Sequence, residues 1–102
     1  MTAAFGMHVR FTAQPGQGDA LAAILLEAAA ALGAVEACRL YVISRSPDDR
    51  DTIWVTEAWT DAEAHAASLQ DEATKAMIAR AMPLIAGRPE ATRLLPAGGK
   101  GL

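Results

Sequence analysis

The sequence predicts an α+β domain whose elements follow the order β-α-β-β-α-β around an antiparallel sheet. Apolar and polar residues alternate in several short stretches, which is typical of half-buried strands. Two longer stretches are rich in alanine, leucine and other strong helix formers. A short polar turn joins the second and third strand-like stretches into a hairpin. This order is the ferredoxin-like arrangement, and no linker divides the 102 residues, so we expect one domain over residues 1–102.

The first strand is expected at residues 7–13 and the first helix at residues 17–32. In MHVRFTA the apolar residues alternate with polar ones, as on a strand with one buried face. The helical stretch QGDALAAILLEAAAAL carries most of its large apolar residues along one stripe. Asp19 is a candidate N-cap, with an alternative start one turn earlier at Pro15 or the glycine after it. Gly33 is expected to end the helix.

Two further strands, at residues 36–45 and 52–59, are expected to form the hairpin. The polar segment SPDDRD between them, residues 46–51, has the composition of a turn. In the later strand Glu57 shares one face with apolar residues, while Trp54 points to the other face. The pattern alone leaves open which face of the sheet meets the helices. If Trp54 lies on the open face, its large ring favours a partner surface there.

The remaining chain is expected to hold two helical pieces and a last strand. The motif T-x-x-E that begins at Thr60 fits a capping box, and the first piece then runs to about Leu69. The second piece covers residues 71–82 and ends near a proline. Residues 90–95 are expected to form a short strand, and the glycine-rich residues 96–102 a flexible tail.

Composition and charge exclude several classes of function. The net charge is −3 and the nine Lys and Arg residues do not cluster, so we expect no nucleic-acid partner. No apolar run is long enough to span a bilayer, so no membrane partner is expected. The N-terminal residues lack a signal-peptide pattern and the one cysteine, Cys38, cannot form an internal disulfide, so we expect a cytoplasmic location. Much of the 52% hydrophobic fraction is alanine, and such a thin core favours self-association.

The segment EAWTDAEAHAASL, residues 57–69, holds the candidate functional residues. Glu57 stands on an apolar strand face, where a carboxylate needs a partner, and the candidates are His65, Arg10 and Arg39. His65 shares a helix face with the apolar residues at 62, 66 and 69, so we expect that face to point inward. Two interpretations of His65 stay open: a buried structural histidine, or a base beside a pocket. Trp59 is expected to form part of the core or the wall of that pocket.

Four motifs carry a resemblance to a known family. They are Gln14-Pro15-Gly16 before the long helix, Cys38-Arg39-Leu40-Tyr41, the turn Ser46-Pro47-Asp48-Asp49, and Glu57-x-Trp59-x-Asp61-x-Glu63-Ala64-His65-x-x-Ser68. In this order and spacing the chain resembles the antibiotic biosynthesis monooxygenase family from about Met7 to Leu95. One departure is Ala37, where the family often has glycine before the cysteine.

The resemblance implies a dimeric α/β barrel, a homodimer whose subunits pack sheet to sheet. It also implies a cofactor-independent monooxygenase, with no metal, haem or flavin. Such an enzyme uses molecular oxygen to oxidise a quinol, an anthrone or another polycyclic phenol, and the deprotonated substrate supplies the electrons. His65 would be the catalytic base and Glu57 would hold it. The candidate substrate-binding residues are Trp59, Phe11, Leu69 and Met77, although Phe11 and Met77 also fit simple core packing.

A related haem-degrading branch fits the sequence less well. That branch typically carries an asparagine on the first strand and a haem-ligating histidine about ten residues after the tryptophan. Here the residue ten positions after Trp59 is Leu69, and the chain has no asparagine. The sequence also lacks H-x-x-x-H and C-x-x-C patterns, so no metal site is expected.

Two other functions remain open. The chain could be a non-catalytic module of the same fold that binds a small aromatic molecule or only dimerises, because a fold alone does not establish an activity. A cofactor-free isomerase or cyclase is a third interpretation, less favoured by the motifs.

Overall fold

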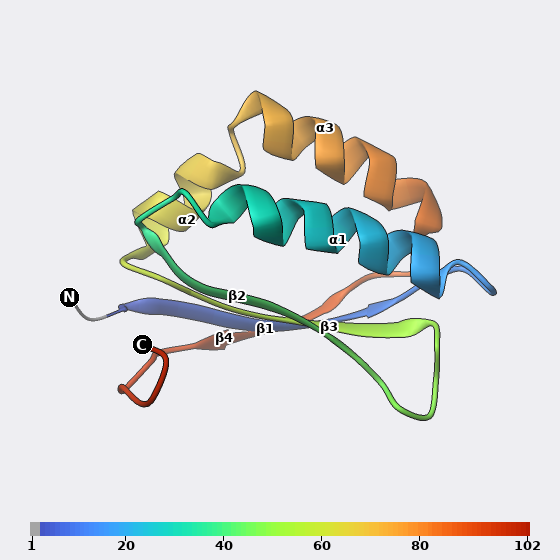
Figure 1. The fold of residues 1–102 in the computed structure, drawn as a ribbon, viewed down its shortest axis with the longest axis horizontal. Helices are drawn as coiled ribbons and strands as arrows, with labels where there is room; N and C mark the ends of the chain where they lie inside the picture. The colour runs from blue at the N-terminus through green and yellow to red at the C-terminus, as the bar shows by residue number, and fades with distance from the viewer. Residues whose placement is uncertain (1–2) are drawn as a thin grey trace.

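The computed structural model describes residues 3–102 and contains four strands, three α-helices and one short 3-10 helix (Figure 1). The predicted α+β order is confirmed, with the second helical region divided into two helices. In chain order the elements are β1 (Phe5–Thr12), α1 (Gly18–Leu32), β2 (Cys38–Arg45), β3 (Thr52–Trp59), α2 (Ala62–Ser68), α3 (Glu72–Ala81), η1 (Met82–Leu84) and β4 (Glu90–Leu94).

The four strands form one antiparallel sheet in the order β2-β3-β1-β4. This is the ferredoxin-like strand order, in which the first and third strands lie at the centre. The register places Val9 opposite Val55 and Met7 opposite Glu57 across the two central strands. A β-bulge interrupts the pairing of β2 with β3 between Cys38 and Leu40.

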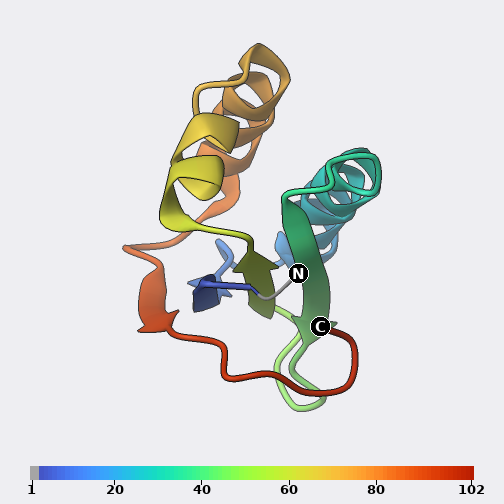
Figure 2. The ribbon, with the colours of Figure 1, turned by 90° about the vertical axis from the view of Figure 1, so that its left-hand side faces the viewer.

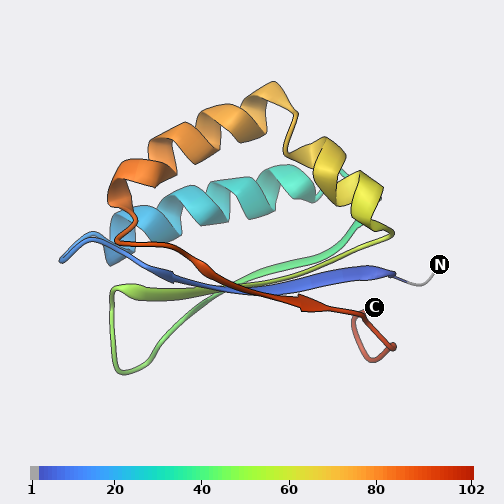
Figure 3. The same ribbon diagram turned by 180° about the vertical axis from the view of Figure 1, so that it is seen from behind.

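All the helices cover the same face of the sheet, and the other face carries none (Figures 1 and 3). The sequence pattern did not decide which face of the sheet meets the helices. The structure shows that it is the face of Ile53, Val55, Glu57 and Trp59, which point toward the helices and are buried. α1 supplies the other half of the core, and Arg80 of α3 reaches Glu27 of α1 at 3.0 Å. The buried core residues are Val9, Ala13, Leu21, Ala22, Ile24, Leu25, Ile53, Val55 and Ala81.

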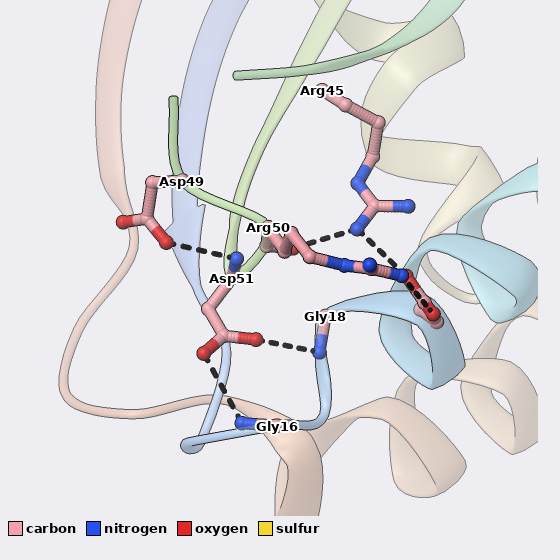
Figure 4. Close-up of polar contacts among 7 residues, drawn as sticks. Gly16, Gly18, Arg45, Asp49, Arg50 and Asp51 are labelled. Carbon is pink, nitrogen blue, oxygen red and sulfur yellow. Dashed lines mark hydrogen bonds and ion pairs between the residues drawn. The ribbon is translucent and has the colours of Figure 1, made fainter. Parts of the chain in front are cut away.

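The start of α1 is held by a residue that lies far away in the sequence (Figure 4). The expected N-cap, Asp19, is wrong: the N-cap position is Gln17, whose side chain makes no capping hydrogen bond. Instead, Asp51 of the β2–β3 turn accepts hydrogen bonds from the backbone N–H groups of Gly16 at 3.1 Å and Gly18 at 3.0 Å. A Cβ at position 18 would collide with the Arg50 carbonyl, so only glycine allows the turn to approach this closely.

Asp19 has a different role from the predicted one. It lies in the first turn of α1 and forms ion pairs with Arg45 at 3.0 Å and Arg50 at 2.9 Å. The side-chain hydrogen bond from Arg45, followed by those from Arg50, lowers the pKa of the Asp19 carboxyl. The hairpin turn and the start of α1 are therefore joined by both hydrogen bonds and charge pairs (Figure 4).

Two expectations about α2 need correction. The N-cap is Asp61 rather than Thr60, and its Oδ1 accepts a 2.7 Å hydrogen bond from the backbone N–H of Ala64. The helix face expected to point inward is largely exposed, including Leu69 at 42%. Of that face only His65 turns inward. The helix has just seven residues and contacts β3 at one end of the sheet, so little of its surface is covered.

The helix-free face of the sheet is partly covered by the C-terminal tail. Figure 2 shows residues 95–102 passing along the side of the sheet away from the helices. Pro96 lies against Gly6, where a Cβ would come within 3.1 Å of the proline ring. Farther along this face the Trp54 ring stacks on His8, with the ring centroids 4.9 Å apart. Within residues 3–102, no helix is both long and apolar enough to cross a membrane.

Candidate functional site

A buried carboxylate lies at the centre of the candidate site. Glu57 belongs to β3 and is only 8% exposed. Its neighbours across the sheet are Met7 on β1 and Tyr41 on β2. A carboxylate in such a position is costly unless it is paired and hydrogen-bonded, so its partners define the site.

One oxygen atom of Glu57 contacts two ring nitrogens. The indole Nε1 of Trp59 donates a 2.8 Å hydrogen bond to Glu57 Oε1. The imidazole Nε2 of His65 lies 3.3 Å from the same oxygen. The two aromatic residues come from different elements, the end of β3 and the middle of α2. Of the three candidate partners of Glu57, His65 is therefore the one that contacts it, and the Trp59 hydrogen bond adds a third member.

The imidazole of His65 is enclosed by two aromatic rings. Phe5, the first residue of β1, stacks on it with centroids 4.4 Å apart and an interplanar angle of 21°. Trp59 meets it edge-on, at 5.6 Å and 74°. The side chain of His65 is 16% exposed. Both the position and the plane of the ring are thus constrained.

The contacts of His65 favour one tautomer. Nε2 lies 3.3 Å from a carboxylate oxygen of Glu57, within ion-pair distance, and a nearby negative charge favours a proton on this nitrogen. The other nitrogen, Nδ1, then carries a lone pair and has no hydrogen-bond partner within residues 3–102. In this state His65 can accept a proton at Nδ1 while Glu57 stabilises the imidazolium that forms.

Tyr41, the last residue of the Cys38-Arg39-Leu40-Tyr41 motif, is a neighbour of Glu57 for which no role at the site was predicted. Burial raises the pKa of its hydroxyl well above the ordinary range, and the charge of Glu57 raises it further. Burial likewise raises the pKa of the Cys38 thiol. Both groups therefore stay protonated at neutral pH, and Tyr41 can act as a hydrogen-bond donor. Only the register between β2 and β3, which the sequence does not reveal, places Tyr41 opposite Glu57.

A hollow of about 270 Å³ opens between the end of α1 and the first half of β2. Neither His65 nor Trp59 lines it. Tyr41 connects the hollow to the cluster around Glu57. It lines the hollow, and it lies directly opposite Glu57 in the pairing of β2 with β3. The lining residues are Ala29, Leu32, Gly33, Cys38, Arg39, Leu40 and Tyr41.

The other predicted substrate contacts lie apart from this cluster. Phe11 pairs with Ile53 at the opposite end of β1 from Phe5, about 20 Å away at some 3.3 Å per residue. Phe11 and Met77 both pack against the hydrophobic core. Leu69 is the C-cap of α2 and is largely exposed. The structure thus brings together Glu57, Trp59 and His65, and the catalytic and substrate-binding roles of all six residues stay predictions.

Metal-ligating side chains do not gather at this site. In the part of the chain that the structure describes, no three His, Cys, Asp or Glu side chains lie close enough together to hold a metal ion.

Comparison with protein-family profiles identifies the family of this chain. A profile of the antibiotic biosynthesis monooxygenase family matches residues 4–80, from β1 through most of α3. The chain belongs to this family. The match includes Glu57, Trp59 and His65 and ends before β4. No curated protein matches the chain.

Solved structures of similar proteins cover nearly the whole chain. A candidate antibiotic biosynthesis monooxygenase from Chloroflexus aurantiacus is 41% identical, with a TM-score of 0.84 over 93% of this chain and 94% of that one. One from Caulobacter crescentus is 23% identical, with a TM-score of 0.85 over 94% and 92%. A mutant of SnoaB, a cofactor-independent oxygenase from Streptomyces nogalater, is 15% identical, with a TM-score of 0.81 over 97% and 98%. The last two likenesses concern the fold alone.

Proposed function

We propose that this protein is a cofactor-independent monooxygenase that oxidises a quinol, an anthrone or another polycyclic phenol with molecular oxygen. The observation that carries the proposal is the contact of His65 with the buried Glu57 carboxylate, which equips one histidine as a base. Membership of the family supports it, and so does the shared fold with SnoaB, a cofactor-independent oxygenase.

In this reaction the Nδ1 atom of His65 accepts a proton from the substrate. The ionised Glu57 stabilises the imidazolium, and the Trp59 N–H holds the carboxylate in place at 2.8 Å. Because the cluster is largely shielded from water, the charge of Glu57 acts on His65 more strongly than it would in bulk solvent. Glu57 is thus the group that orients His65, and His65 is the group that meets the substrate.

The electrons come from the substrate itself. For an anthrone, loss of a proton from the CH₂ carbon leaves a carbanion, which passes one electron to O₂. The resulting carbon radical and superoxide combine to form a peroxide. His65 returns its proton to the outer oxygen of the peroxide. It then takes the second hydrogen from carbon as a proton while the O–O bond breaks, which gives the C=O product and hydroxide. The hydroxide takes this proton from His65 and leaves as water. One CH₂ and one O₂ therefore become one C=O and one H₂O.

The hollow beside Tyr41 is the proposed entrance for the aromatic substrate. Its volume of about 270 Å³ suits part of a polycyclic ring system, with the remainder of the substrate outside the hollow. The Tyr41 hydroxyl, held protonated by its raised pKa, would donate to a substrate oxygen. Trp59 does not line this hollow, and its proposed role here is to hold the Glu57 carboxylate through the indole N–H.

A homodimer through the helix-free face of the sheet completes the proposal. Trp54 and Val42 lie on that face, and Val42 is 44% exposed. Replacing Trp54 with arginine should then give a monomer in sedimentation experiments, while the same replacement at Leu26 on α1 should leave the dimer intact. A wild-type monomer at micromolar concentration would count against the dimer. Cytoplasmic location remains a prediction.

Oxygen uptake with a panel of reduced naphthoquinols and anthrones tests the activity. We expect uptake by the wild type and a fall of about 100-fold or more in His65→Ala, in line with the usual contribution of a general base. His8→Ala is the matched control, because His8 lies on the opposite face of the sheet. Equal rates for wild type and His65→Ala would show that His65 is not the base.

The hollow also favours a second candidate, a module that binds a small aromatic molecule without turnover, because neither His65 nor Trp59 lines it. Quenching of tryptophan fluorescence by the same compounds without oxygen uptake would support this candidate. Conversion of the compounds under anaerobic conditions would instead indicate an isomerase or cyclase.

A further inference from the structure

An arginine from the edge strand of the sheet lies over the aromatic ring that holds His65. The guanidinium carbon of Arg93, on β4, is 4.0 Å from the centroid of the Phe5 ring. The register explains this approach, because Arg93 pairs with Met7 and so lies on the helix-covered side of the sheet, two residues along from Phe5.

The Phe5 ring is therefore enclosed on both sides. Its centroid lies 4.4 Å from that of His65, in a nearly parallel stack, and 4.0 Å from the Arg93 guanidinium. A group stacked at such a distance occupies one whole face of a phenyl ring. The two groups must then occupy opposite faces, which gives the layered order Arg93, Phe5, His65.

Arg93 differs from several other arginines in what it contacts. Arg10, Arg45, Arg50 and Arg80 each form an ion pair with a carboxylate. Arg93 forms no such pair within residues 3–102, and its recorded partner is the Phe5 ring. An exposed guanidinium is attracted by the negative face of a phenyl ring, so Arg93 covers Phe5 on the solvent side.

We propose that Phe5 and Arg93 are positioning residues for His65, which fix the plane of its imidazole so that Nε2 faces Glu57. The contact with Glu57 sets the direction of one ring nitrogen but leaves the ring free to tilt about that contact. The stack on Phe5 removes this freedom, and Arg93 limits the movement of Phe5. This inference deepens the proposed function and rests on it for the role of His65 as a base.

The chain offers a spectroscopic test, because His8 and His65 are its only two histidines. Each stacks on an aromatic ring that has an arginine over it: His8 on Trp54 with Arg10 at 5.8 Å, and His65 on Phe5 with Arg93. The imidazole proton signals can be assigned with His8→Gln. We expect Arg93→Gln to shift and broaden the His65 signals and leave those of His8 in place. Arg10→Gln is the matched control and should do the reverse.

Two conservative variants separate positioning from general loss of structure. Arg93→Lys keeps a cation that can lie over the ring and should restore the wild-type His65 signals. Phe5→Tyr keeps the stacked ring and should also preserve them, whereas Phe5→Leu should move them downfield by removing the ring current. If Arg93→Gln and Phe5→Leu leave the His65 signals unchanged, or if Arg10→Gln moves both histidines equally, the proposal is wrong.

Oxygen uptake adds a second readout. With a substrate that the wild type oxidises, Arg93→Gln should lower kcat by about tenfold, with KM little changed, since a misplaced catalytic group affects the reaction more than binding. Arg93→Lys should recover most of this loss. An unchanged kcat in Arg93→Gln would contradict the positioning role. If the wild type oxidises none of the compounds, the proposed function fails, while the histidine signals still decide whether Phe5 and Arg93 orient His65.

Discussion

The indole N–H of Trp59 donates a 2.8 Å hydrogen bond to the buried carboxylate of Glu57, two residues earlier on the same strand. Residues two apart on a strand point to the same face, so β3 provides both the carboxylate and its closest donor without help from another element. His65 then approaches the same oxygen from α2. The pair is thus a preformed part of the site, to which the histidine is added.

The Trp59–Glu57 hydrogen bond should be measurable as a coupling free energy. In a double-mutant cycle of Trp59→Phe and Glu57→Gln, followed by urea unfolding, we expect about 1.5–3 kcal/mol, the range for hydrogen bonds to charged groups. The matched cycle pairs Glu57→Gln with Trp54→Phe. Trp54 points to the other face of the sheet, so its coupling should stay within about 0.5 kcal/mol. Similar coupling in both cycles would contradict a specific role for Trp59.

Tyr41 allows the environment of Glu57 to be measured directly, because it is the only tyrosine in the chain. Burial and then the charge of Glu57 raise the pKa of its hydroxyl. The tyrosinate absorbance should therefore appear only well above the ordinary pKa of about 10, and Glu57→Gln should shift it to lower pH. Glu27→Gln, on the exposed side of α1, is the control. Titration of the folded wild type at the same pH as the urea-unfolded chain would show that the hydroxyl is not buried.

The same shift predicts how stability depends on alkaline pH. The pKa of Tyr41 is higher in the folded state than in the unfolded state. Its contribution to the free energy of unfolding is therefore complete below the unfolded value of about 10, and it is lost as pH rises above that value. Tyr41→Phe has no ionisable hydroxyl, so its urea midpoint should decline less than that of the wild type above roughly pH 10. Parallel declines would contradict the linkage.

The acidic side of the pH range tests Asp19. Its carboxyl pKa is lowered in the folded state, chiefly by Arg45, so its contribution is present above the unfolded value of 3.8 and is lost as pH falls below it. We expect Asp19→Asn to weaken the dependence of the urea midpoint on pH between roughly pH 5 and pH 2. Asp48→Asn is the control, because no arginine pairs with Asp48 in residues 3–102. Equal effects of the two substitutions would indicate a nonspecific effect of charge.

The predictable parts of the fold are those that follow from the local periodicity of apolar and polar residues. Alternation along 52–59 predicts β3 residue for residue, and the same alternation places Glu57 and Trp59 on one face. For the partner of Glu57 the sequence left three candidates, His65, Arg10 and Arg39, and the structure identifies His65. The features that were predictable need only residues within about one turn or one strand of each other.

The parts that were missed depend on contacts between distant segments. Asp51 caps the start of α1 across 33 positions of sequence, whereas a capping motif is sought within a few residues, so Asp19 looked like the better candidate. The direction in which α2 faces was wrong because a helix of seven residues contains too few turns for its periodicity to decide. Tyr41 and Arg93 reach the site only through the register of β2 and β4, which no local pattern reveals.

The cap from Asp51 provides a test of this long-range contact. Asp51→Ala removes the acceptor of two backbone N–H groups, those of Gly16 and Gly18, and should lower the free energy of unfolding by about 1–2 kcal/mol in urea. Asp48→Ala, in the same exposed turn, should cost less than about 0.5 kcal/mol, as is usual for surface substitutions. Gly18→Ala supplies an independent check. Alanine favours helices over glycine by up to about 1 kcal/mol, yet here it should destabilise, because its Cβ would strike the Arg50 carbonyl and push the turn away from α1. A stabilising effect of Gly18→Ala would mean that the turn and the helix do not approach each other as closely as Figure 4 shows.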